Sequence, residues 1–167
     1  MSGLFLDSNL GRFMKKQTTK INETRIWVEI MNNDTVKKFI VFLNTNEQLF
    51  EKGINSEGVS LKEIGGNDLT DSGYAPSTIE RKKRKSGKGG KFSNITLYDT
   101  GDFYESHDVK VDPKGFEIIA NPNKSTTNLY VEWGTEITGL TEESLQKLID
   151  FVLIRYQIYT KNVIFKR

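Results

Sequence analysis

The stretch that decides the fold is TEESLQKLIDFVLIRYQIYTKNV, residues 141–163. Thr141 is a suitable N-cap for a helix, and Glu142 and Glu143 fall in the first turn, where the helix dipole favours acidic side chains. Apolar residues follow at helical spacing in one stripe: Leu145, Leu148, Ile149, Val152, Tyr156, Tyr159 and Val163. A second stripe contains Phe151, Ile154 and Ile158. A helix that is apolar on two sides needs two partners, so we expect it to pack on its own sheet and on something else, for which a neighbouring subunit is one candidate.

A second helical region is predicted near residues 34–52. Asp34 is suited to be its N-cap. Apolar residues then follow at helical spacing: Val36, Phe39, Ile40 and Leu43. Residues 45–48 fit a capping box with Thr45 as N-cap, and Gly53 is suited to end the helix. Segment 24–31 is ambiguous, because its apolar residues alternate as in a strand while the flanking residues permit a helix.

Residues 94–134 have the character of β-strands. The alternating residues of 109–118 predict a hairpin that turns at Asp112-Pro113-Lys114-Gly115. A further strand is predicted from Ile95 and Leu97 towards Phe103 and Tyr104, and another at 129–133, where apolar and polar residues alternate. The expected fold is an α+β domain with an antiparallel sheet of about four strands, flanked by the helix near 34–52 and the helix at 141–163.

The length of 167 residues suits one domain with a core. We expect residues 1–20, a polar stretch with a few apolar residues, to be a flexible N-terminal arm that orders only against a neighbour. Residues 21–167 are then a single domain. Residues 53–93 hold eight of the 14 glycines and little periodic apolar pattern, which predicts a long mobile loop at 54–93.

Composition excludes several classes of protein. With 36% hydrophobic and 28% charged residues, the chain is too apolar for a disordered protein and too polar for a membrane protein. The segment MSGLFLDSNLGRFMKK places its apolar residues before its basic ones, which is the reverse of a signal peptide. There is no cysteine and one histidine, His107, so disulfides, thiolate zinc sites, cysteine nucleophiles and multi-histidine metal centres are excluded.

Charge is concentrated in one segment, RKKRKSGKGGK at 81–91. It carries seven basic residues and no acid, while the whole chain has a net charge of +2, so the remainder of the chain carries −5. Its glycines disfavour a helix and indicate an exposed loop. Such a segment either is simply solvated or contacts nucleic-acid phosphates or an acidic protein surface. The candidate contact residues are Arg81, Lys82, Lys83, Arg84, Lys85, Lys88 and Lys91.

Motifs of enzymes are weak in this sequence. SGKGGKFS (86–93) lacks the first glycine of a phosphate-binding loop and has Phe92 where Ser or Thr is needed. Asp99-Thr100-Gly101 resembles the active-site loop of retroviral-type aspartic proteases, in which two carboxylates meet in a homodimer. The bulky Phe103 that soon follows departs from that family, and the same three residues also suit a plain turn. We assign no catalytic, metal-binding or cofactor-binding residue.

Four stretches together resemble a known group of proteins: LNTNEQLFEKGINSEG (43–58), GYAPSTIERKK (73–83), ITLYDTGDFYES (95–106) and EWGTEITGLTEESLQKLIDFV (132–152). Their order is similar to that in virion-morphogenesis, tail-completion and head–tail joining proteins of tailed bacteriophages, especially phages of Bacteroidota. In that group a Thr-Gly-aromatic segment opens the sheet and a C-terminal amphipathic helix packs on it.

The resemblance implies a structural virion protein and not an enzyme. Such proteins form rings of identical subunits at the neck or tail end that bridge portal and tail, and they assemble in the host cytoplasm without a membrane or a cofactor. The implied partners are further copies of the chain, the portal or an adjacent connector and tail proteins, and packaged DNA bound without sequence preference. The alternatives are a nucleic-acid-binding module that uses residues 81–91 and a dimeric aspartic protease that uses Asp99-Thr100-Gly101. Candidate subunit-interface residues are Phe103, Tyr104, Phe151, Ile154 and Ile158.

Overall fold

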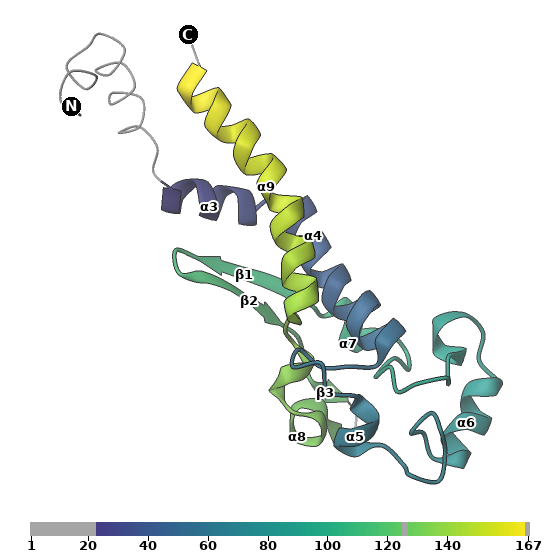
Figure 1. Cartoon of the computed structure of the whole chain (residues 1–167). Coiled ribbons are helices and arrows are strands. Elements are labelled where there is room, and N and C mark those ends of the chain that lie inside the picture. Colours follow the sequence, from purple (N-terminus) through teal and green to yellow (C-terminus); the bar gives the residue numbers. More distant parts are fainter. Residues whose placement is uncertain (1–22, 125–126, 166–167) are drawn as a thin grey trace, which may run out of the picture.

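The protein folds into helices and two short antiparallel hairpins (Figure 1). The structure is a computed structural model that describes residues 23–124 and 127–165. The helical elements are α3 (Glu23–Met31), α4 (Asp34–Phe42), η1 (Leu43–Lys52), α5 (Leu61–Gly65), α6 (Pro76–Lys83), η2 (Gly87–Gly90), α7 (Asp102–Glu105), α8 (Leu129–Trp133), η3 (Thr135–Ile137) and α9 (Glu142–Phe165). The strands are β1 (Asp108–Asp112), β2 (Gly115–Ile119), β3 (Asn123–Lys124) and β4 (Thr127–Asn128). The α+β class and the helices expected near 34–52 and at 141–163 are confirmed.

The ambiguous segment 24–31 is the helix α3, because Ile26 and Ile30, four residues apart, are both buried on one side. The next helix begins after Asn33, whose side chain accepts a hydrogen bond from the N–H of Thr35 at 3.0 Å. Asn33, and not Asp34, is therefore the N-cap.

The helix α4 continues without interruption into η1, a π-helix. The predicted restart at Thr45 is wrong, because the Thr45 hydroxyl donates back to the carbonyl of Val41 at 2.7 Å within the same helix. Gly53 ends the helix with a φ of +64°, and a Cβ at this position would approach the carbonyl oxygen of Ile95 to 2.8 Å. Both the conformation and the space there require glycine.

Two hydrophobic clusters form the core, and both include residues of the continuous α4–η1 helix. The first, the helical core, consists of Ile26, Ile30, Met31, Val36, Ile40, Leu43, Val109, Ile118, Leu148 and Val152. The second, the loop core, consists of Leu49, Phe50, Leu61, Ile95, Leu97, Phe103, Tyr104, Leu129, Trp133 and Ile137. The helical core includes residues of α4 and the loop core includes residues of η1, so the long helix connects the two clusters.

Buried amides on η1 fix where α9 begins. Asn44 donates to the carbonyls of Ile137 at 3.1 Å and Gly139 at 2.8 Å, and Gln48 donates to the carbonyl of Gly139 at 3.0 Å. Gln48 also accepts a hydrogen bond from the N–H of Thr141 at 3.0 Å. Thr141 in turn caps α9, as predicted, by accepting from the N–H of Ser144 at 3.3 Å. The segment 137–141 is thus held by side chains rather than by a sheet.

The four strands form two separate pairs, β1–β2 and β3–β4, and not one sheet. The predicted hairpin is confirmed, with Val109 opposite Ile118 and Val111 opposite Phe116. The Asp112 carboxylate shapes its turn by accepting from the N–H groups of residues 114 and 115 at 2.6 and 2.9 Å.

Two predicted strands are not strands. Leu97 has a φ of +55°, which breaks the extended backbone between Ile95 and the short helix α7. Residues 129–133 form the helix α8, in which Leu129 and Trp133 are buried while Val131 is 87% exposed. Residues four apart, such as Leu129 and Trp133, lie on the same side of both a helix and a strand, so their burial fits either structure. In a strand Val131 would lie on that side too, whereas in a helix it points to solvent.

Segment 54–93, predicted as a long loop, contains the short helices α5, α6 and η2. The arm predicted at residues 1–20 lies outside the described residues. Within residues 23–124 and 127–165, no helix combines the length and the apolar character needed to cross a membrane.

Candidate functional site

The basic segment 81–91 is folded against the loop core and is not an isolated loop tip. Its first three residues are the last turn of α6, and residues 87–90 form the turn η2. Gly87 takes a φ of +61°, and Gly90 lies so close to the carbonyl of Lys85 that a Cβ would be 2.4 Å from it. The glycines that argued against a helix therefore allow the segment to turn back on itself.

Lys82 is the most buried cation of the segment, with 2% of its surface exposed. Its ammonium group donates to the carbonyl of Tyr98 at 2.9 Å and to that of Gly89 at 3.4 Å, and it lies 4.9 Å from the centre of the Tyr74 ring. Burial lowers the pKa of Lys82 from 10.5 to about 8. The Lys82 side chain therefore points into the protein in this conformation, and its contact with DNA or an acidic partner stays a prediction.

Most of the other cations in the segment also have partners within the chain. Lys85 forms an ion pair with Asp99, and this hydrogen bond lowers the pKa of the Asp99 carboxyl. Lys91 pairs with Glu51 at 2.9 Å and lies 4.6 Å from the centre of the Phe50 ring. Lys83 pairs with Glu80 at 2.8 Å, and Lys88 donates a hydrogen bond to the side chain of Asn46 at 3.2 Å.

Arg81 and Arg84 are the remaining members of the predicted set. Both are exposed, and neither side chain makes a hydrogen bond or ion pair within the described part of the chain. Fewer cations are therefore available to an acidic partner than the seven basic residues of the segment indicate.

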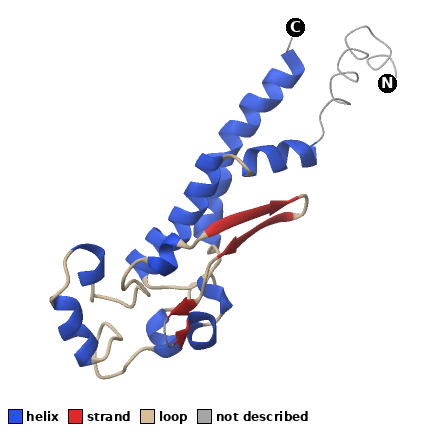
Figure 2. Ribbon diagram, turned by 180° about the vertical axis from the view of Figure 1, so that it is seen from behind, coloured by secondary structure: helices blue, strands red, loops and turns tan. Residues whose placement is uncertain are grey.

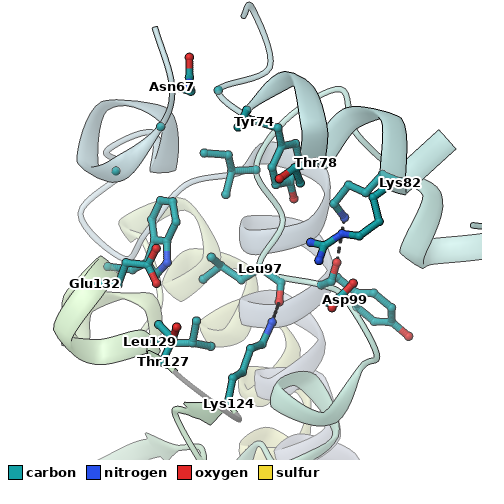
Figure 3. Close-up of a pocket in the computed structure, with 18 residues that line it drawn as sticks. Asn67, Tyr74, Thr78, Lys82, Leu97, Asp99, Lys124, Thr127, Leu129 and Glu132 are labelled. Atoms are coloured by element: carbon teal, nitrogen blue, oxygen red, sulfur yellow. Dashed lines mark hydrogen bonds between the residues drawn. The ribbon is translucent and has the colours of Figure 1, made fainter. Parts of the chain in front are cut away.

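A pocket of about 570 Å³ opens beside the segment, as Figure 3 shows. Its apolar wall includes Leu97 and Leu129, and its charged residues are the following: Arg81, Lys82, Asp99, Lys124 and Glu132. The ammonium group of Lys124 donates to the carbonyl of Leu97 at 3.2 Å, and burial lowers its pKa. Lys82 and Lys124 thus brace adjacent carbonyls of the irregular segment 95–99 from two sides.

The sequence prediction missed Lys124 and the ring of Tyr74 as parts of this pocket. Tyr74 holds the same segment, since its hydroxyl accepts from the N–H of Thr96 at 2.9 Å and lies 3.2 Å from the Thr96 hydroxyl. The only sequence signal was the unusual Tyr74-Ala75-Pro76 stretch ahead of α6. Among the described residues, no three His, Cys, Asp or Glu side chains come together as a metal site.

The Asp99-Thr100-Gly101 stretch is a turn. Gly101 has a φ of +112°, and the Thr100 hydroxyl donates to the Asp102 carboxylate at 2.8 Å. The Asp99 carboxylate is engaged by Lys85, whereas an aspartic protease requires it to share a proton with a second carboxylate. The surroundings of Asp99 favour the turn over the protease loop.

The predicted interface residues separate into two groups. Phe103 and Tyr104 are buried in the loop core, so in this conformation their side chains face the interior of the chain, and their role in a subunit interface stays a prediction. Tyr104 donates its hydroxyl hydrogen to the carbonyl of Thr96. Phe151 is half-buried, with its ring centre 4.3 Å from that of Phe39.

By contrast, Ile154 and Ile158 are 61% and 56% exposed on α9. Two further apolar residues of the same helix, Ile149 and Leu153, are 54% and 49% exposed. The sequence pattern places Ile149 in the first apolar stripe, with Leu148 and Val152, and assigns Leu153 to neither stripe. The four-residue spacing of Ile149 and Leu153, equal to that of Ile154 and Ile158, was the available signal.

No known protein family, curated protein or solved structure matches the chain.

Proposed function

We propose that this protein is a structural subunit of a tailed-bacteriophage virion that forms rings at the head–tail interface and bridges portal and tail. The observation that carries the proposal is the exposed apolar surface of α9, where four large side chains, Ile149, Leu153, Ile154 and Ile158, are each about half exposed or more. Several large apolar side chains gathered on one helix are typical of an interaction surface.

The four side chains form two patches on different sides of the helix. Patch A is Ile154 with Ile158, and patch B is Ile149 with Leu153. Equivalent positions in the two patches are five residues apart, which corresponds to about 140° around an α-helix. A ring subunit contacts its two neighbours through two different surfaces, whereas a two-fold dimer uses one surface twice. Two separate patches therefore favour the ring.

The stretches that carry the resemblance to phage virion proteins pack against one another, which supports reading them as one unit. Lys82 of the second stretch binds the carbonyl of Tyr98 in the third. Gln48 of the first stretch bonds to Gly139 and Thr141 of the fourth. Stretches far apart in sequence thus form one set of contacts that includes the base of α9.

The remaining parts of the proposal follow from the resemblance. The protein assembles in the host cytoplasm and resides in the neck or tail region of the virion, next to the portal or a connector and tail proteins. Its role is structural and not enzymatic. Arg81 and Arg84 are the cations placed to contact DNA phosphates or an acidic neighbour without sequence preference.

The proposal is tested by light scattering and negative-stain electron microscopy on the purified chain. We expect closed rings at high concentration. The variant Ile154→Lys with Ile158→Lys removes patch A, and Ile149→Lys with Leu153→Lys removes patch B. Each is expected to prevent ring formation, because a charge cannot be buried in an apolar contact. Leu69→Lys is the matched control, since Leu69 is 83% exposed and lies away from α9.

Mixing the two double variants distinguishes a ring from a two-fold dimer. If patch A of one subunit meets patch B of the next, the mixture forms a heterodimer through the one contact that remains intact. A two-fold contact through patch A instead leaves the patch B variant dimeric by itself. A wild-type chain that stays monomeric, both alone and with its phage neighbours, contradicts the proposed function.

A further inference from the structure

The strand β2 has an open edge. Its sheet consists of β1 and β2 alone, and β1 packs beside α3 and α4. Figures 1 and 2 both show β2 on the side of the hairpin that faces away from these helices. No other described strand pairs with β2, so the backbone groups on its outer edge have no strand partner among the described residues.

The pairing register identifies those backbone groups. Val109 lies opposite Ile118, and the N–H of Val109 is bonded to the Asp108 carboxylate at 2.7 Å, which takes it out of the ladder. Antiparallel pairs alternate between hydrogen-bonded and non-hydrogen-bonded. Phe116, opposite Val111, therefore also belongs to a non-hydrogen-bonded pair. The N–H and C=O groups of Phe116 and Ile118 point away from β1, and no backbone bond to another described element satisfies them.

The composition of β2 leaves this edge unprotected. Its sequence, Gly-Phe-Glu-Ile-Ile, has no proline or lysine and a single charge, at Glu117. Strand edges that must avoid pairing usually carry such residues or a bulge. The opposite edge differs, because β1 contains Lys110 and two aspartates, and one of these already binds the N–H of Val109. The favourable edge for an added strand is that of β2.

We infer that the outer edge of β2 accepts an added strand from a second copy of the chain, supplied by the segment around Leu4-Phe5-Leu6. This inference rests on the proposed ring. The 22 residues that precede α3 lie outside the described residues. A chain of that length spans at most about 75 Å when extended, against about 17 Å for a five-residue strand, so reach does not limit the contact.

The charge of the segment and the side from which it reaches the edge both favour a segment from a second copy. Leu4, Phe5 and Leu6 are apolar, and the residues that follow are basic at 12, 15 and 16. The solvent side of the hairpin carries three exposed carboxylates, of Asp108, Asp112 and Glu117, against two exposed lysines, Lys110 and Lys114, and this net negative charge attracts such a segment. The chain enters α3 on the helix side of the hairpin, with β1 between α3 and the open edge (Figure 1). A neighbour's segment approaches the edge without passing around the hairpin. It also links different surfaces of successive subunits, as a ring requires.

Cross-linking tests the inference, because the chain contains no cysteine of its own. Protein carrying Leu6→Cys is mixed with protein carrying Glu117→Cys and treated with a short bismaleimide. We expect a cross-linked heterodimer. Asp68→Cys in place of Glu117→Cys is the matched control, since Asp68 is also an exposed acid but lies away from the hairpin, and it is expected to give none.

A second pair of variants tests the edge itself in the Glu117→Cys protein. Phe116→Pro removes the outward N–H, whereas Phe116→Ala removes the same aromatic ring and keeps the N–H. The cross-link is expected to be lost in the first variant and retained in the second, provided that circular dichroism shows both to be folded. If Phe116→Pro does not fold, the cross-link between Leu6→Cys and Glu117→Cys by itself decides whether the segment of a second copy lies beside β2.

The outcomes separate this inference from the proposed function. Rings without the cross-link overturn the added strand and leave the ring proposal intact. A cross-link that forms only within single chains carrying both cysteines also overturns it, because the segment then pairs with its own hairpin. A monomeric wild-type chain overturns both.

Discussion

Gln48→Met is the substitution that most directly tests how α9 is held. Gln48 is fully buried on η1 and makes two hydrogen bonds to the segment that leads into α9, one to the carbonyl of Gly139 and one from the N–H of Thr141. Methionine has a similar shape and no comparable polar groups, so it removes the two bonds with little change in packing.

The two lost bonds differ in cost. The carbonyl of Gly139 keeps its bond from Asn44 at 2.8 Å, so losing Gln48 there costs about 1 kcal/mol. The N–H of Thr141 has no other partner among the described residues, so at its buried position it is left unsatisfied, at a cost of about 1–3 kcal/mol. The apolar side chain recovers a part of this, and we expect the free energy of unfolding to fall by about 2–3 kcal/mol.

Urea unfolding followed by circular dichroism measures the change. The matched control is Gln146→Met, the same substitution on the exposed side of α9, where Gln146 bonds only to Asp150 at 3.0 Å. Its effect should stay within about 0.5 kcal/mol. Equal effects of the two substitutions would refute the reasoning, because they would mean that the buried amide does not hold the start of α9.

Three further predictions concern charged and titratable groups. Because the pKa of Lys82 is about 8 when folded and 10.5 when unfolded, the unfolded chain holds an extra proton between these pH values, so the free energy of unfolding should rise with pH in this window. Lys82→Met should remove that rise in urea unfolding at pH 8 and 9.5, and an unchanged slope would contradict it. Burial lowers the pKa of His107, whose Nε2 has no hydrogen-bond partner among the described residues, so the free energy of unfolding should fall as the pH drops below 6.5. His107→Phe should therefore reduce the change of the thermal midpoint between pH 7.5 and pH 5. Any DNA binding should weaken with salt, and Arg81→Gln with Arg84→Gln should reduce the slope of log affinity against log salt by about 2 in filter binding, whereas Lys83→Gln, at a residue paired with Glu80, should change it less.

The sequence predicted those elements whose pattern is long or whose turn chemistry is specific. Residues 141–163 repeat the helical spacing over several turns, and Asp112-Pro113-Lys114-Gly115 has residue types that favour a turn. The failures are short. Five residues at 129–133 fit a strand and a helix equally well, and burial of Trp133 against the loop core decided between them. The positive φ of Leu97 has no sequence signal, because lysines and a tyrosine distant in sequence hold that segment.

The candidate site shows the same limit of local pattern. A count of charges identified the basic segment, but the partners that bury Lys82 lie 7 and 16 residues further along the chain, at Gly89 and Tyr98. A run of lysines forms an exposed surface only when no other segment folds back over it. Here the glycines at 87–90 supply the turn that makes such a return possible. Charge density therefore indicated where the segment lies and not which of its residues face a partner.

The arrangement of surfaces favours assembly through unlike contacts. Patches A and B are on different sides of α9, and the open edge of β2 lies on a third element. A two-fold dimer brings one surface against its own copy, so it leaves the other two exposed. A ring in which each subunit meets two neighbours covers both patches, and an added strand covers the edge. Only the second arrangement covers all three features, and the helical core joins the helix that carries the patches to the hairpin, because Leu148 and Val152 of α9 belong to the same cluster as Val109 and Ile118.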